Sequence, residues 1–167
     1  MRTINDVFPV SQVLTALQTV MLPNTRVQLA GGAIYVNDAT SLVNMSATWP
    51  SVSLYEKGQN TARISYRTFQ TRLQIVACYY DRWDGQQSSL SAIWSMVDLD
   101  LRRMKANVED NPALYVSGTR NCEGTVEFVL SSYEGSAIAP TDGPFPVPVV
   151  MRTATISVNC LPYISNK

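Results

Sequence analysis

Histidine is absent from this 167-residue chain, and neither of the common glycine-rich phosphate motifs occurs in it, whether GxxxxGK followed by Ser or Thr, or GxGxxG. Without an imidazole the chain cannot build a Ser-His-Asp or Cys-His catalytic pair, nor the commonest nitrogen-ligand metal sites. The Gly31-Gly32 pair indicates only a turn. We therefore expect a protein that is not an enzyme and that has no catalytic residue, no cofactor and no metal site.

Charge is scarce and balanced. Charged residues make up 16% of the chain, with 13 Lys and Arg against 13 Asp and Glu, while hydrophobic residues reach 46%. No net field concentrates phosphates, so we expect no sequence-specific binding of nucleic acid. The two local groups of cations are interpreted as solvated faces of a strand and a helix: Arg63, Arg67 and Arg72, and Arg102, Arg103 and Lys105. So weakly charged a surface suits either burial against protein partners or a plain neutral exterior.

Long apolar runs are also missing. No stretch of about 18 apolar residues occurs, and the N-terminal pattern lacks the apolar core of a signal peptide. We expect a soluble protein, made in the cytoplasm, with no membrane partner. The three cysteines, Cys78, Cys122 and Cys160, are odd in number and widely spaced, which fits neither a disulfide framework nor a zinc site. They are interpreted as small apolar side chains.

The length predicts one domain over residues 1–167. Apolar residues recur at helical spacing from Pro9 to Met21 and again from Leu90 to Met104, where Ser88 or Ser89 is the expected cap. Extended segments are predicted at residues 26–29, 33–36, 51–56, 61–80, 125–133 and 153–160, with residues 57–60 as a hairpin turn. The expected fold class is α+β: an antiparallel or mixed sheet of about four to six strands with a long hairpin, packed by an N-terminal helix and one central helix.

A proline-rich segment at residues 135–148 is long for a connection within a compact domain. It is also apolar, which is typical of a loop that docks onto a neighbour, although a plain surface linker is equally consistent with the sequence. Together with the predicted hairpin turn it supplies the candidate subunit contacts. These are Lys57, Gly58, Gln59, Asn60, Ile138, Pro140, Phe145, Pro146 and Val147.

One carboxylate arrangement allows a different function. Asp81 and Asp84 flank Trp83, as in a site that places a carboxylate beside an aromatic platform for a sugar. The favoured interpretation is a loop between strand and helix, in which the aspartates accept hydrogen bonds from backbone amides. The nearby aromatics Tyr79 and Tyr80 are expected to pack in the core rather than to stack on bases.

The order of elements resembles the tail terminator, or tail completion, proteins of long-tailed bacteriophages. Three segments carry the resemblance: residues 66–76, the helix of residues 90–104, and Asn111-Pro112-Ala113-Leu114 leading into residues 125–129. It implies a structural virion protein of the tail or neck, assembled in the host, whose ring, expected to be a hexamer, caps the tail tube and joins it to the head connector. DNA would pass through such a ring. Other small neck, connector or tail proteins share this architecture, and the segment of residues 39–56 is longer than a minimal terminator needs; a carbohydrate-binding domain is the remaining alternative.

Overall fold

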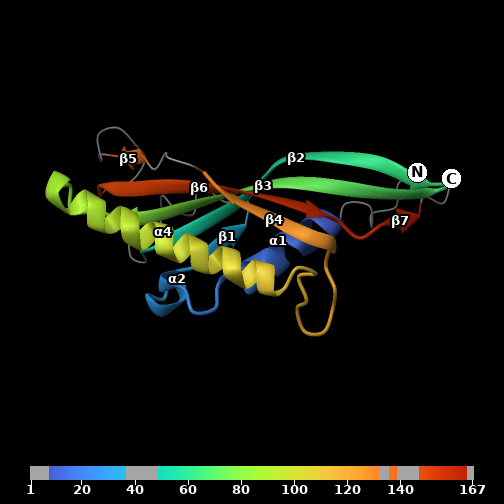
Figure 1. Ribbon diagram of the computed structural model, residues 1–167, viewed down its shortest axis with the longest axis horizontal. Helices are drawn as coiled ribbons and strands as arrows, with labels where there is room; N and C mark the ends of the chain where they lie inside the picture. Colours follow the sequence, from blue (N-terminus) through green and yellow to red (C-terminus); the bar gives the residue numbers. More distant parts are fainter. Residues whose placement is uncertain (1–7, 37–48, 132–135, 139–146, 165–167) are drawn as a thin grey trace.

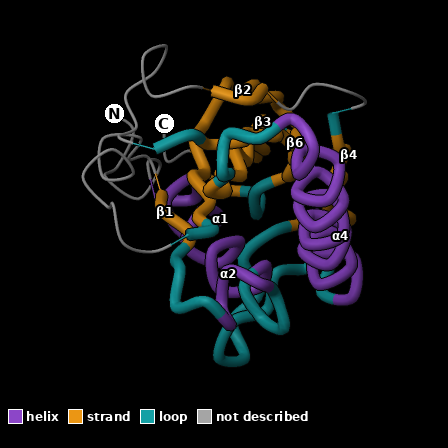
Figure 2. Tube along the Cα trace, turned by 90° about the vertical axis from the view of Figure 1, so that its left-hand side faces the viewer, coloured by secondary structure: helices purple, strands orange, loops and turns teal. Residues whose placement is uncertain are grey.

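The computed structural model describes residues 8–36, 49–131, 136–138 and 147–164. Helices α1 (Phe8–Met21), α2 (Arg26–Leu29) and α4 (Gln87–Asp110) lie on one face of a seven-stranded sheet (Figures 1 and 2). The strands are β1 (Ile34–Val36), β2 (Ser51–Ser65), β3 (Thr68–Arg82), β4 (Glu123–Leu130), β5 (Ser136–Ile138), β6 (Val149–Asn159) and β7 (Tyr163–Ile164).

The sheet is mixed, with the strand order β1-β2-β3-β6-β4. β1 runs parallel to β2, and every other pair is antiparallel, including β5 and β7, which add to β6 and β3. The predicted α+β class is therefore confirmed. The strand number exceeds the predicted four to six because β5 and β7 are only three and two residues long, too short to produce a readable alternation.

The centre of the sheet is formed by β3 and β6, whose alternation is as the sequence predicts. Ile75 lies opposite Ile156 and Ala77 opposite Ala154, so one face of both strands is apolar. β4 extends this face with Phe128, which lies opposite Ile156. The helix-covered residues of these strands are fully or almost fully buried: Leu73, Ile75, Ala77, Tyr79, Val126, Phe128, Ala154, Ile156 and Val158.

Helices α1 and α4 supply the other side of the core, and both predictions of helix are confirmed. The buried positions follow the 3.6-residue period, as in Leu14 and Leu17 of α1 and Val97, Leu101 and Met104 of α4. All three cysteines are free and buried, and Cys122 and Cys160 belong to this core. This confirms their interpretation as small apolar side chains. Burial raises the pKa of the Cys122 thiol to about 11.

The start of α4 differs from the prediction. Its N-cap is Gln86, which makes no side-chain capping bond, and Ser88 and Ser89 lie inside the first turn. Asp84 accepts the Gln86 amide at 2.8 Å, and the Ser89 hydroxyl donates to the Gln86 carbonyl. A loop carboxylate thus does the work expected of a serine cap.

Residues 26–29 were predicted as a strand and form the short helix α2. Thr25 caps it, since its hydroxyl oxygen accepts the Gln28 amide at 3.2 Å. Gly31 then adopts a left-handed conformation with φ of 69°, and the Gly32 amide donates to the Val27 carbonyl, which closes the helix. The capping threonine is a signal that the apolar alternation of this segment obscured.

Gly32 leaves no room for a side chain, because a Cβ added there would lie 2.1 Å from the Pro50 carbonyl oxygen. We expect Gly32→Ala to lower the free energy of unfolding by about 1–3 kcal/mol, because backbone must move to relieve the overlap. Gly58→Ala is the matched control: no atom lies within 4 Å of its added Cβ, so the change should stay within about 0.5 kcal/mol. Urea unfolding of both variants checks this, and equal stabilities would contradict it.

Candidate functional site

The β2–β3 hairpin is longer than the layer to which it belongs, and its outer part extends away from the helices (Figure 1). The strands pair continuously from Ser51 opposite Tyr80 to Ser65 opposite Thr68. β6 accompanies β3 only as far as Arg72, beyond which the short strand β7 is the remaining neighbour. We call residues 57–72 the arm. Its residues are half-buried or exposed except for Thr71, so little of the arm belongs to the core.

The tip of the arm is a cationic and aromatic turn. Tyr66 and Arg67 connect the strands, and Arg67 has a positive φ of 66°. The guanidinium carbons of Arg63 and Arg67 lie 5.5 and 5.2 Å from the centre of the Tyr66 ring, within the range of a cation–π contact. Tyr66 is nonetheless 76% exposed, and Ile64 is 52% exposed. The tip thus presents two guanidinium groups beside apolar surface.

Charge along the arm has one sign. Residues 57–72 include Lys57, Arg63, Arg67 and Arg72 but no Asp or Glu. Arg72 forms an ion pair of 3.0 Å with Glu127 of β4, and both side chains are more than half exposed. Within the described residues Lys57, Arg63 and Arg67 have no ion pair. The cations of the arm were expected to be a simple solvated face. The structure adds that Arg63 and Arg67 are grouped around the exposed ring of Tyr66.

The predicted turn at Lys57, Gly58, Gln59 and Asn60 is wrong. These residues lie inside β2, and the chain reverses at Tyr66 instead. The register shifts between Glu56 and Gly58, so a bulge absorbs the residues whose composition indicated a turn. With Arg72 and Gln74, three of them (Gly58, Gln59 and Asn60) line an open polar depression of about 510 Å³ at the base of the arm.

The proline-rich segment was predicted to lack regular structure, which is wrong for residues 136–138. They form β5, in which Ile138 lies opposite Val149 of β6. Val147 is half-buried and packs in a small apolar cluster with Val149. The candidate contacts Pro140, Phe145 and Pro146 lie outside the described residues.

The arrangement of Asp81, Trp83 and Asp84 does not form an open sugar site. Asp81 is 4% exposed and accepts hydrogen bonds from the Arg26 guanidinium and the Arg82 amide, each at 2.8 Å. The Trp83 indole donates to the Gln86 carbonyl and the Ser89 hydroxyl, and Asp84 holds the start of α4. The favoured interpretation is confirmed for Asp84, which lies in the loop and accepts a backbone amide at the helix start, whereas Asp81 is a buried residue of β3 rather than of the loop.

A buried polar network joins α2, β3 and α4, and no sequence pattern indicated it. Asp100, on the buried face of α4, accepts the Arg26 amide at 2.8 Å and the Tyr79 phenol at 2.7 Å. Burial raises the pKa of Tyr79, and the Asp100 carboxylate raises it further, so the phenol remains a donor. Burial also raises the pKa of Asp81, against the opposing effect of Arg26. The network confirms that Tyr79 is a core residue.

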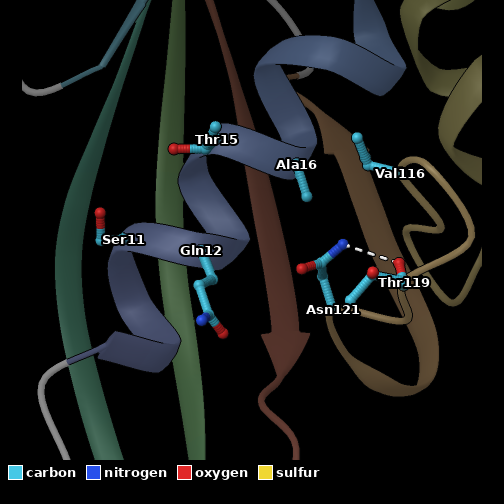
Figure 3. A pocket seen from close by; sticks show the side chains of 7 residues that line it. All are labelled: Ser11, Gln12, Thr15, Ala16, Val116, Thr119 and Asn121. Atoms are coloured by element: carbon cyan, nitrogen blue, oxygen red, sulfur yellow. Dashed lines mark hydrogen bonds between the residues drawn. The ribbon is translucent and has the colours of Figure 1, made fainter. Parts of the chain in front are cut away.

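The other depressions of the surface are shallow. One of about 250 Å³ lies between α1 and the loop before β4 and is lined by Ser11, Gln12, Thr15, Ala16, Val116, Thr119 and Asn121 (Figure 3). Its walls offer hydroxyl and amide groups, with the Asn121 amide fixed on the Thr119 carbonyl at 3.0 Å. No titratable side chain lines it, so its lining can hydrogen-bond a polar group but holds no acid or base.

Tyr79→Phe tests the network. Tyr79 is fully buried, so removal of its hydroxyl leaves the Asp100 carboxylate short of a donor, and we expect the free energy of unfolding at pH 7 to fall by about 1.5–3 kcal/mol. Tyr115→Phe, at a side chain that is 53% exposed, is the control and should change it by less than about 0.5 kcal/mol. Chemical denaturation measures both. A Tyr79→Phe protein as stable as the parent would show that the buried carboxylate does not need this bond.

None of the helices in the described ranges is long and apolar enough to cross a membrane. In the same ranges no three His, Cys, Asp or Glu side chains are grouped as metal ligands. The geometry therefore offers one distinctive feature, the projecting cationic arm, and comparison with known proteins adds no family to it: no protein-family model and no curated protein matches the chain.

Proposed function

We propose that this protein is a structural subunit of the neck of a long-tailed bacteriophage, resembling a tail terminator, and that copies of it form a ring on the tail tube. The observation that carries the proposal is the arm. A two-stranded ribbon is marginally stable by itself in water, and the arm adds little to the core of its own domain. Its exposed apolar and aromatic side chains become stabilising when another subunit covers them.

The position of the arm allows it to reach a neighbouring copy. The arm extends from one side of the body, away from the ends of α1 and α4 (Figure 1). When each arm docks on the next copy and the same two copies do not exchange arms, the contact is heterologous, and such contacts close into rings when the rotation between copies allows it. A sixfold ring, the tail tube protein and the head connector as neighbours, and a location in the virion are the specific parts of the proposal that the resemblance supplies.

The alternatives differ in what they require of the molecule. Another connector or tail subunit would use the arm in the same way, and only the neighbour would change. A carbohydrate-binding domain would need a free carboxylate beside Trp83, whereas Asp81 is enclosed and paired with Arg26, and the exposed Asp84 accepts the Gln86 amide. The surface geometry therefore favours an assembly protein.

Shortening the arm tests the proposal. Thr61 lies opposite Thr71, with their hydroxyl oxygens 2.8 Å apart, so replacing residues 62–70 by Asn-Gly keeps the register of the inner hairpin. We expect the shortened protein to keep its circular dichroism and cooperative unfolding, but to form no rings and to leave tail tubes undecorated in electron microscopy. A parallel deletion of residues 139–146 measures the contribution of the proline-rich segment.

The parent chain serves as the reference in the same experiment. Rings at one end of the tube with the parent and none with the folded, shortened variant support a terminator. Rings formed equally well by both proteins would refute the role of the arm. A parent that neither assembles nor binds tubes would count against the neck function altogether.

A further inference from the structure

The cations at the tip of the arm make no ion pair with the residues that the structure describes, so they are available to an anionic partner. Arg63 and Arg67 have no carboxylate within the described residues. Arg63 donates to the Ser65 carbonyl at 3.1 Å, and both guanidinium groups face Tyr66. This local packing holds the cations in a defined place, so that less side-chain entropy is lost when they bind.

The edges of the arm are poorly suited to pairing with another strand. The outer edge of β2 carries Lys57 and a bulge between Glu56 and Gly58, and a second irregularity lies between Arg63 and Ser65. A lysine and bulges on an edge strand are devices that prevent edge-to-edge association. Any contact of the arm with another molecule is therefore expected to use the side chains of the tip rather than the backbone edges of the arm.

Two carboxylates of the described residues that are not buried have no ion pair or hydrogen bond there: the half-buried Glu56 of β2 and the exposed Asp110. Five others are engaged: Asp84 with the Gln86 amide, Asp98 with Arg102 and Arg152, Glu109 with Lys105, Glu123 with Arg120, and Glu127 with Arg72. Asp110 is exposed and has neither an ion pair nor a hydrogen bond there. An arginine that approached Asp110 would not have to displace a bond already made.

Asp110 also lies on a concave surface beside the C-terminal ends of two helices. A depression of about 310 Å³ is lined by Thr19, Val20, Pro23, Asn107, Asp110, Asn111 and Tyr115. Both α1 and α4 end beside it, and neither has a basic residue in its last turn. The carboxyl ends of helices carry partial negative charge, which favours a bound cation. Tyr115, which is 53% exposed, adds an aromatic face on which a guanidinium group can stack.

The walls of this depression are held in place before any partner binds. The Asn107 side-chain amide donates to the Met21 and Pro23 carbonyls at 3.1 and 2.8 Å, which fixes the end of α1 against α4. Asn111 makes two bonds with the backbone of Tyr115, at 3.0 and 2.9 Å. The site is therefore preorganised, which reduces the cost of ordering it on association.

We propose that the tip of the arm of one copy docks in the depression at the ends of α1 and α4 of a second copy, with an arginine of the tip against Asp110 and Tyr115. The hairpin turn at the tip and the C-terminal ends of α1 and α4 lie apart in one chain (Figure 1), so the tip cannot dock on its own depression, and a second copy supplies the complementary charge. The charges of the two surfaces are complementary, and the contact is heterologous when it joins each copy to the next around a ring. The inference rests on the self-assembly part of the proposed function and names the surfaces that would meet.

Reciprocal charge reversal tests the contact, with three variants of the full chain: R67E, D110R and R67E/D110R. Sedimentation velocity over a concentration series measures self-association, and circular dichroism confirms that each variant is folded. We expect each single variant to weaken association roughly tenfold or more and the double variant to recover most of the loss. Arg82→Glu, which makes the same charge change at an exposed residue outside the arm, is the control and should leave association unchanged.

The outcomes separate this inference from the proposed function. If the parent associates and neither single variant weakens it, the docking inference is wrong while self-assembly stands. The same conclusion holds if both singles weaken association but the double variant recovers nothing. A parent that is monomeric up to about 1 mM overturns the inference, and the neck function is then judged separately by whether the protein binds tail tubes. A specific contact between charged groups also requires that association weaken as salt is added.

Discussion

The packing of α2 and α4 against the sheet depends on one buried carboxylate. Asp100 is 1% exposed and receives hydrogen bonds from the start of α2 and from Tyr79 in the centre of β3. The fold is destabilised by several kcal/mol when a buried carboxylate loses its hydrogen-bond donors. For this reason α4, α2 and β3 cannot separate from one another independently. The apolar contacts around it stabilise the core without direction, whereas this group fixes which residues of the three elements must meet.

The same network gives the long hairpin a fixed base. Arg26 contributes its backbone amide to Asp100 and its guanidinium to Asp81, which lies at the inner end of β3. β3 is thus held by helices and β6 at one end, whereas at the other end it pairs with β2 and the two-residue strand β7. This asymmetry explains how fifteen-residue strands can persist when only part of their length is buried. It also separates two roles, since substitutions at the tip need not disturb the core.

The fold class follows from the sequence because its strongest patterns are also its most buried segments. The alternation in residues 153–160 and the helical spacing after Leu90 reflect apolar side chains that reach the core in the structure. The patterns fail where composition and tertiary contact disagree. Lys57 and Gly58 belong to residue types that favour turns, yet they lie in the bulged strand β2. The strand continues through them because β3 pairs with the residues on both sides of the bulge. Thr25 caps a short helix that is held by two tertiary contacts, the hydrogen bond of its first amide to Asp100 and the burial of Val27 in the core.

The candidate site was harder to predict than the fold, for a physical reason. Arg63 and Arg67 are recognisable in the sequence as cations, but their placement around Tyr66 depends on where the hairpin reverses. If the turn is predicted at residues 57–60, Arg63 and Arg67 fall in the middle of a strand, where they are interpreted as part of a solvated face. The depression containing Asp110 joins helix ends separated by more than eighty residues, and no local pattern indicates such a meeting.

The bulge at Glu56 and Gly58 lies where the hairpin leaves the body of the domain. Bulges bend a strand and increase its local twist, so the geometry of this bulge sets the direction in which the arm leaves the domain. In any closed assembly built on the arm, the bend at the bulge would set the angle between neighbouring subunits and therefore the curvature of the assembly. A family of such proteins could change the diameter of its assemblies by altering one strand irregularity, while both docking faces stayed the same.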